Sequence, residues 1–219
     1  MAAAPRIALI HATPIAMEPI QASFKASWPD AHLVNLLEDS LSPDRAAVQE
    51  ITPELDDRIF RLADYAYRSG CAAVLFTCSA FGSSIEAAAG RLPIPVLKPN
   101  EAMFEAAIAQ GGRTAMIYTF PPARDGMEAE FHEEAARLNP SATIRSYLAE
   151  GAIEAARKGD TETHNRLVSE VAANLENFDA IMLGHFSTAR AINSVRAVSS
   201  IPVFSSPDAA VEKLQRILA

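Results

Sequence analysis

The sequence predicts an α/β protein built from two similar lobes, each a Rossmann-like (flavodoxin-like) arrangement of helices around a parallel sheet. Three observations support this prediction. Short apolar segments alternate with longer amphipathic segments along the 219 residues, which is typical of strands alternating with helices. The segment AAVLFT at 72–77 is apolar almost throughout, as in a parallel strand covered on both faces. The chain also partly matches itself after a shift of about half its length.

The first elements follow from local patterns. A strand is predicted over 6–12, a helix over 17–27, which ends at Trp-Pro-Asp, and a second strand over 31–36. The buried strand at 72–77 comes after a further helix, described next. Strands and helices continue to alternate to the end of the chain, which favours an α/β fold over separate all-α or all-β domains.

The helix predicted over 53–69 has the clearest signals. Thr52 can cap its N-terminus, Pro53 suits its first turn, and Gly70 follows its end. Its apolar positions form one stripe, at Leu55, Ile59, Leu62, Ala63 and Ala66.

An internal repeat is the strongest signal of architecture. Several separate segments match after a single shift of 107 residues and without a gap. The matching pairs are 6–10 with 113–117, Pro14 with Pro121, 73–75 with 180–182, and 94–96 with 201–203. Four matches in one register favour a duplicated α/β unit of about half the chain. We therefore expect a first lobe over 1–98, completed by a C-terminal helix at 207–219, and a second lobe over 99–206, with a cleft between them.

Composition excludes several classes of partner. Nineteen basic and 27 acidic residues give a net charge of −8, and the isoelectric point is near 5.1. A chain without a basic stripe is a poor partner for nucleic acid or an anionic membrane surface. The apolar start of the chain is short and interrupted by His11, Thr13 and Pro14, unlike a signal sequence or a spanning helix. We therefore expect a cytoplasmic protein with no nucleic-acid or membrane partner.

Cofactor and metal motifs are missing from the sequence. It has no Gly-rich dinucleotide fingerprint, phosphate loop or GxSxG nucleophile elbow, and its two cysteines, Cys71 and Cys78, do not have a metal-ligand spacing. We expect no cofactor, no metal site and reduced thiols. Cys71, at the start of a strand, is interpreted as structural.

Cys78 and His185 are the best catalytic candidates. The shift of 107 places them on each other, in LFTCSAFGSS and MLGHFSTARA, just past a buried strand and just before a helix. Ligands of parallel α/β sheets bind beyond the carboxyl ends of the strands. Two related lobes facing each other would therefore place a thiol and an imidazole on opposite sides of one ligand. Helix N-terminal amides can lower the pKa of such a thiol, and imidazole suits acid–base work near neutral pH.

Other polar side chains at the predicted strand ends could line the same cleft. His11 ends the first strand and matches Tyr118 in the repeat. Hydroxyls that could bind a carboxylate follow the strands, at Thr13, Ser79, Thr119, Ser187 and Thr188. The remaining histidines, His32, His132 and His164, have charged neighbours and are interpreted as surface residues.

These segments together resemble the aspartate/glutamate/hydantoin racemase superfamily, which includes maleate isomerase and arylmalonate decarboxylase. The resemblance spans nearly the whole chain. It rests on the order of RIALIHATP, LFTCSAFG, IPVLKPNEAMFEAA, the strand ending at Tyr118 and Thr119, LGHFS and IPVFSSPDAA. It implies two pseudo-symmetric lobes, cofactor-independent chemistry next to a carboxylate, and a homo-oligomer.

The resemblance also implies roles for particular residues. Racemases of this family use two cysteines, one per lobe, and the first corresponds to Cys78. The second position is occupied by His185, so a symmetric pair of thiols is replaced by a Cys/His pair. By resemblance, a small carboxylate or hydantoin-like substrate would contact the loops that hold His11, Thr13, Ser79, Tyr118, Thr119, Phe186 and Ser187.

Three activities remain open at this stage. The first is an isomerase of racemase or epimerase type, in which Cys78 and His185 act on opposite faces of the α-carbon. The second uses Cys78 alone, as an arylmalonate-type decarboxylase or a maleate-type cis–trans isomerase. The third is a non-catalytic carboxylate-binding protein.

Overall fold

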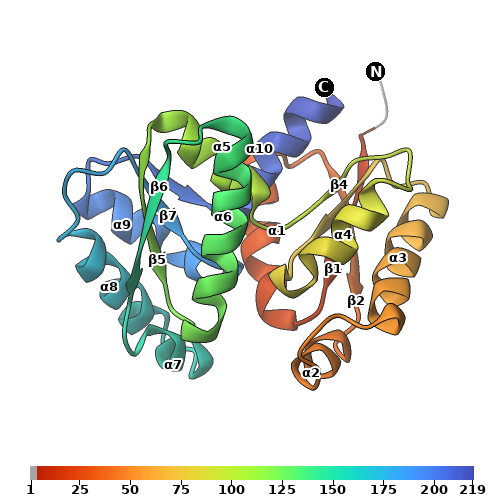
Figure 1. Ribbon diagram of the computed structural model, residues 1–219, viewed down its shortest axis with the longest axis horizontal. Coiled ribbons are helices and arrows are strands. Elements are labelled where there is room, and N and C mark those ends of the chain that lie inside the picture. The colour runs from red at the N-terminus through yellow and green to blue at the C-terminus, as the bar shows by residue number, and fades with distance from the viewer. Residues whose placement is uncertain (1–3) are drawn as a thin grey trace. The chain divides into compact units, whose positions relative to one another are not determined.

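The computed structural model describes residues 4–219, which form two compact units. The first reaches up to Pro99 and takes in Ala210–Ala219, and the second comprises Asn100–Ala209. Each unit holds a four-stranded parallel sheet with helices on both faces (Figure 1). The predicted fold class, α/β with two lobes and parallel sheets, is confirmed.

The first lobe has the strand order β2-β1-β3-β4, the first part of the flavodoxin-like order. Its elements are β1 (Arg6–His11), η1 (Pro14–Ala16), α1 (Met17–Ser27), β2 (His32–Leu37), α2 (Leu41–Ala46), α3 (Pro53–Arg68), β3 (Ala73–Phe76), η2 (Ser79–Phe81), α4 (Gly82–Ala89) and β4 (Val96–Leu97).

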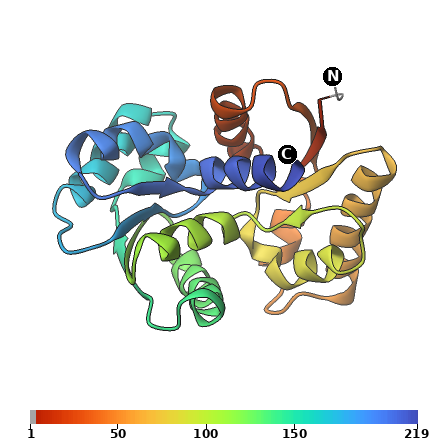
Figure 2. The ribbon, with the colours of Figure 1, turned by 90° about the horizontal axis from the view of Figure 1, so that it is seen from above.

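The second lobe repeats this order as β6-β5-β7-β8. Its elements are α5 (Glu101–Gln110), β5 (Arg113–Tyr118), η3 (Pro121–Ala123), α6 (Arg124–Leu138), β6 (Thr143–Leu148), α7 (Ala152–Arg157), α8 (Thr161–Ala172), β7 (Ala180–Leu183), η4 (Phe186–Ala191), α9 (Ile192–Val198) and β8 (Val203–Ser205). The last helix, α10 (Ser206–Leu218), runs directly on from β8 toward the C-terminus (Figure 2).

The duplication seen in the sequence is a duplication of structure. β5, η3, α6 and β7 each begin 107 residues after β1, η1, α1 and β3. The strand registers agree as well, since Ile7 pairs with Ala73 in one sheet and Thr114 with Ala180 in the other. β6 begins at 143 and β2 at 32, a separation of 111, so the helix before β6 carries four extra residues.

Helix α3 forms for the reasons that the sequence suggested. Thr52 Oγ1 accepts a hydrogen bond from the Leu55 amide at 3.4 Å, and Gly70 has a φ of +78°, which favours glycine. The predicted apolar stripe packs on the sheet, where α3 and α4 share a core with β1 and β3. α1 has the bounds predicted for it, whereas the strands differ from the predictions by one residue at some ends.

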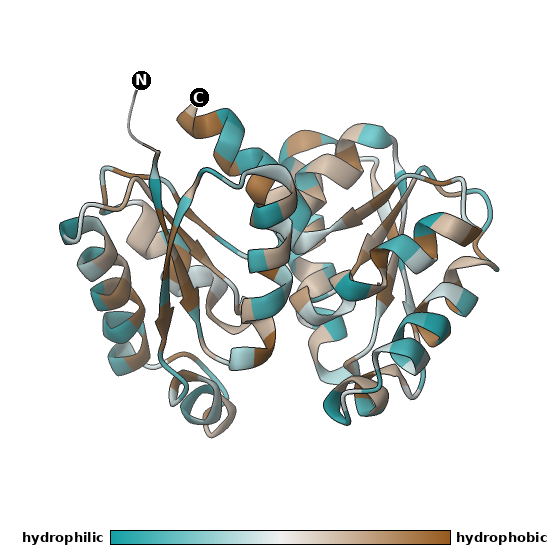
Figure 3. Cartoon of the chain, turned by 180° about the vertical axis from the view of Figure 1, so that it is seen from behind, coloured by the Kyte–Doolittle hydropathy of each residue, from teal (hydrophilic) through white to brown (hydrophobic). Residues whose placement is uncertain are grey.

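The second lobe has one core on each face of its sheet. α8 and α9 pack on the face that presents Ala115 and Ile117, and α5 and α6 pack on the face that presents Met116. The strands are mostly hydrophobic and the helices carry both hydrophobic and hydrophilic positions, as expected for amphipathic helices on an apolar sheet (Figure 3). Within residues 4–219, no helix is long and apolar enough to cross a membrane.

Candidate active site

Each lobe brings polar side chains together beyond the carboxyl ends of its central strands, where ligands of parallel α/β sheets bind. In the first lobe β1 ends at His11 and β3 leads into Thr77 and Cys78. In the second lobe β5 ends at Tyr118 and β7 leads into His185. These two groups are described in turn as the first and second half-sites.

Cys78 is the central group of the first half-site. It has an extended backbone and directly precedes η2, and its side chain is half-buried. Burial raises the pKa of its thiol, whereas a hydrogen bond from the Ala80 amide and the charge of Arg45 act in the opposite direction. The net pKa lies above the ordinary value, so the thiol is protonated at neutral pH and can act as an acid.

Arg45 is a residue of this half-site that the sequence analysis missed. It lies on α2, and its guanidinium donates from Nε to the Ala80 carbonyl at 3.1 Å and from Nη1 to the Val48 carbonyl at 2.9 Å. It therefore ties the turn that follows Cys78 to the end of α2. It is also the one cation that lowers the pKa of Cys78 among the interactions resolved for that thiol.

His11 lies behind Cys78 in the first lobe. It is fully buried, with Nδ1 2.8 Å from Thr77 Oγ1 and Nε2 3.1 Å from Asn35 Oδ1. Burial lowers its pKa, so the ring is neutral at neutral pH despite the opposing bond to Asn35. Both ring nitrogens thus have partners inside the lobe, and the imidazole holds the residue that precedes Cys78.

The other residues predicted in the first half-site are more exposed. Thr13 precedes η1 in an extended conformation and its side chain makes no capping hydrogen bond. Ser79 begins η2 next to Cys78 and is half-buried. Cys71, by contrast, is 3 % exposed and belongs to the core under α3, as predicted for a structural cysteine.

His185 occupies an unusual backbone conformation in the second half-site. Its φ of +71° and ψ of +149° lie in a region that L side chains rarely adopt. Such a conformation costs roughly 1–3 kcal/mol and persists only where the surrounding structure holds it in place. The preceding Gly184 is packed so closely that a Cβ there would lie 3.3 Å from the Ile117 carbonyl oxygen and from Met127 Cε.

The His185 side chain is desolvated. Burial alone lowers its pKa from 6.5 to about 4, and its Nε2 is buried with no hydrogen-bond partner within residues 4–219. The Phe120 ring meets the imidazole edge to face, with centroids 6.5 Å apart. The imidazole is therefore neutral at neutral pH, with a basic nitrogen that no other group of its lobe neutralises.

The remaining residues predicted in the second half-site lie around His185. Tyr118 is 7 % and Thr119 is 1 % exposed. Thr119 Oγ1 lies 3.4 Å from Oγ1 of Thr188, which is fully buried in η4. Phe186 is nearly buried at the start of η4, and Ser187 after it is half-buried.

One histidine prediction was wrong. His164 was interpreted as a surface residue, but it is fully buried on α8, where its Nδ1 lies 2.8 Å from Asn165 Oδ1. Its spacing from Val168 and Ala172 places it on the buried stripe of the helix. His32 and His132 are exposed, as predicted.

The two half-sites supply complementary groups. One presents a protonated thiol and the other a neutral imidazole, each in the corresponding place of its own repeat. A neutral imidazole is a base and a protonated thiol is an acid, so the pair has the components for general acid–base transfer at neutral pH. No group of three or more His, Cys, Asp or Glu side chains able to hold a metal ion occurs in residues 4–219.

Comparison with solved structures reveals the same fold in several racemases. An allantoin racemase from Klebsiella pneumoniae superposes with a TM-score of 0.76 and 18 % identity, covering 98 % of this chain and 88 % of that chain. For a glutamate racemase from Bacillus anthracis the TM-score is 0.70 and the identity 14 %, covering 98 % and 81 %. A double mutant of arylmalonate decarboxylase in the liganded form, with one cysteine introduced and another replaced by serine, gives 0.66 and 21 %, covering 97 % and 92 %.

Sequence comparison identifies the family. No curated protein matches the chain. The model of the Asp/Glu/Hydantoin racemase family matches residues 7–184, which is most of the chain and includes all of the first half-site. Membership supports an isomerase of the racemase type. The chain belongs to the Asp/Glu/hydantoin racemase family.

Proposed function

We propose that the protein is a cofactor-independent isomerase of racemase or epimerase type. It moves a proton at the carbon next to the carboxylate or carbonyl of a small amino-acid, hydantoin or diacid substrate. The observation that carries this proposal is the equivalence of Cys78 and His185, which occupy the same place in the two repeats. In this proposal they act on opposite faces of one substrate carbon.

Their protonation states define the direction of the resting enzyme. His185 Nε2, neutral because burial lowers its pKa to about 4, removes the α-proton. The electron pair of the C–H bond moves onto the carboxylate or carbonyl oxygen and gives an enolate. Cys78, protonated because burial raises its pKa, returns a proton to the other face. The product has the inverted configuration, and the imidazolium and thiolate that remain are ready for the reverse reaction.

The enolate charge requires hydrogen-bond donors. Preorganised donors at the site of developing charge are commonly the largest contribution to catalysis of this kind. We assign this role to the hydroxyls and loop amides at Thr13, Ser79, Thr119 and Ser187. Tyr118 and Phe186 would shape the pocket. His11 contributes through Thr77, because both of its ring nitrogens are already bonded inside the lobe.

A second candidate uses the thiol alone. Cys71 lies in the core, so Cys78 is the one cysteine at a strand end. A single thiol is sufficient to protonate the carbanion left when a disubstituted malonate loses CO2, or to add to an unsaturated diacid. Release of CO2 from an arylmalonate, or conversion of maleate to its trans isomer, would select these activities. Ligand-induced thermal stabilisation without any product would instead indicate a carboxylate-binding protein.

Deuterium uptake tests the main proposal. The protein is incubated in D2O with chiral amino acids, hydantoins and 2-substituted carboxylates, and the α-proton is followed by NMR. The matched control is Cys78→Ser, which removes the thiol and keeps a hydroxyl of similar size. Uptake that requires Cys78 supports proton transfer and names the substrate class. A chain that exchanges none of these compounds is not a racemase of this group.

The proposal includes a cytoplasmic enzyme that works as a homo-oligomer. Reduced cysteines and an acidic composition favour the first, and the resemblance to the family favours the second. Fractionation and the mass of the purified protein in solution test the two.

A further inference from the structure

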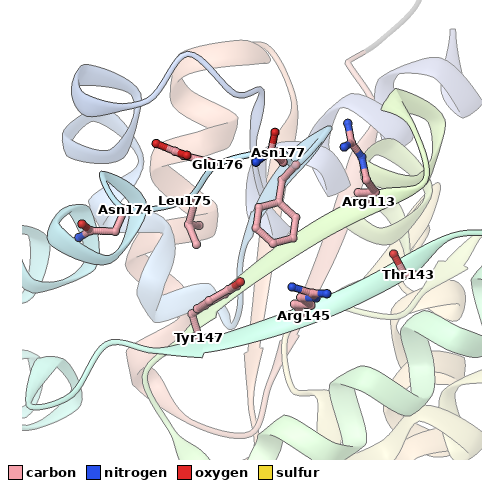
Figure 4. A pocket seen from close by; sticks show the side chains of 9 residues that line it. Arg113, Thr143, Arg145, Tyr147, Asn174, Leu175, Glu176 and Asn177 are labelled. Atoms are coloured by element: carbon pink, nitrogen blue, oxygen red, sulfur yellow. The ribbon is translucent and has the colours of Figure 1, made fainter.

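A pocket of about 500 Å³ lies beside the edge strand β6, within the second lobe (Figure 4). It is lined by side chains of β5, β6 and the segment between α8 and β7, including Arg113, Arg145, Tyr147 and Phe178. Arg113 is the first residue of β5, whereas the candidate half-site follows the last residue of that strand. The strand length of six residues separates them by about 16 Å.

The first lobe provides an internal reference for this pocket. Arg145 pairs with Ala115 and Tyr147 with Ile117 on neighbouring strands. The corresponding pairs in the first lobe have Val34 opposite Ala8 and Leu36 opposite Ile10. Val34 and Leu36 pack against the core under α3. The second lobe thus carries a cation and a phenol where the first lobe has aliphatic side chains.

A third position follows the same rule. The Asp179 amide donates to the Arg113 carbonyl at 2.8 Å, as the Ala72 amide donates to that of Arg6 at 2.7 Å. Phe178 therefore stands in the place of Cys71, which is a core residue in the first lobe. Its ring meets that of Tyr147 edge to face, with centroids 5.9 Å apart and an angle of 85°.

A shorter helix leaves the space open. α3 has 16 residues and ends at Arg68, four residues before β3 begins. α8 has 12 residues and ends at Ala172, so seven residues connect it to β7. That connection lines the pocket instead of covering the sheet face with a further turn of helix.

The charged groups of the pocket differ in what already binds them. The Arg113 guanidinium is held by Asp179, with Nη2 2.7 Å from Oδ1. Arg145 is exposed and has no ion pair or side-chain hydrogen bond within residues 4–219. Glu176 lies at the end of the pocket away from both arginines (Figure 4). The pocket therefore offers an available guanidinium on a protein whose net charge is −8.

We propose that this pocket binds a small aromatic carboxylate. The guanidinium of Arg145 matches a carboxylate in a bidentate fashion, and the faces of Tyr147 and Phe178 provide a surface for a flat apolar ring. The side-chain amides of Asn174 and Asn177 add donors at the rim. This inference does not depend on the proposed function, because no residue of either half-site lines the pocket.

The test uses 1-naphthoate as the probe and the 15N-labelled full chain as the receptor. Amide shifts are followed at millimolar probe concentrations, and affinities are compared among variants. The key variants are Arg145→Val and Tyr147→Leu, which install the residues that the first lobe carries at the same positions. Both are therefore compatible with the fold, and their melting temperatures provide the check.

We expect shifts concentrated in β6 and the segment between α8 and β7. Arg145→Val should bind the probe about tenfold more weakly, a loss of about 1.4 kcal/mol. 1-Naphthalenemethanol, which keeps the ring and lacks the charge, should bind with a similar deficit. Cys78→Ser should leave the affinity unchanged. Absence of saturable shifts, equal affinity in Arg145→Val, or loss of binding in Cys78→Ser would each overturn the inference.

Discussion

Replacing His185 by Asn should make the stability of the protein less sensitive to mild acid. Burial holds the pKa of the folded imidazole at about 4, against 6.5 for an ordinary histidine. Between these two values the unfolded chain binds a proton that the folded chain does not. The free energy of unfolding therefore falls as the pH drops from 7 toward 4. Asn is chosen because it tolerates a positive φ better than most residues and does not titrate.

The two pKa values set the magnitude. At pH 5 an unfolded imidazole is almost fully protonated, whereas the folded His185 is still mostly neutral. Relative to pH 7, this difference destabilises the wild-type protein by about 2 kcal/mol, rising to about 3 kcal/mol below pH 4. Burial also lowers the pKa of His11 and His164, but both are present in the wild type and the variant, so their effects cancel in the comparison.

Urea unfolding at pH 7 and pH 5 measures this effect. The wild type should lose about 2 kcal/mol more than His185→Asn on going to the lower pH. NMR titration of the imidazole gives the same answer directly, as a pKa near 4. Equal pH dependence in the two proteins, or an imidazole pKa near 6.5, would refute the claim that His185 is desolvated.

Three further substitutions test other parts of the structure. Arg45→Met should raise the pKa of Cys78, because it removes the nearby charge and releases the turn at Ala80; the pH profile of iodoacetamide alkylation at Cys78 should move to higher pH, and an unchanged profile would argue against the contact. Gly111→Ala should destabilise the protein by about 1–3 kcal/mol, because its Cβ would lie 2.5 Å from Asp179 Cβ, and a melting temperature equal to that of the wild type would contradict this. Thr52→Ala should cost about 1 kcal/mol in urea unfolding through loss of the α3 cap, whereas Thr52→Ser should cost little.

The fold was largely predictable because duplication and local pattern agree. Strand and helix signals in either half are modest, but matches in one register reinforce each other. The repeat failed where its register changes. β6 follows β2 by 111 rather than 107 residues, so a fixed shift cannot align these two edge strands.

The candidate residues at strand ends were predictable for the same reason. Cys78 and His185 stand out because they match after the shift and follow buried strands. Their protonation states were not predictable, since the lowered pKa of His185 comes from burial by side chains such as Phe120 from another loop. Pattern alone does not measure that desolvation.

Other features depended on contacts between distant segments. Arg45 was missed because it lies on a short helix 33 residues before the thiol that its charge affects. The burial of His164 did have a signal, since it lies four residues before Val168 and eight before Ala172 on one helix face. Its charged neighbours in the sequence outweighed that spacing in the prediction.

Exchange of the α-proton in D2O, followed for each enantiomer separately, tests the central claim most directly. The claim is that Cys78 and His185 act on opposite faces of one substrate carbon. The wild type should exchange the α-proton of both enantiomers. Cys78→Ser should lose exchange with one enantiomer, and His185→Asn should lose exchange with the other. If both variants lose the same enantiomer, or if His185→Asn exchanges both at the wild-type rate, the two residues do not act as an opposed pair.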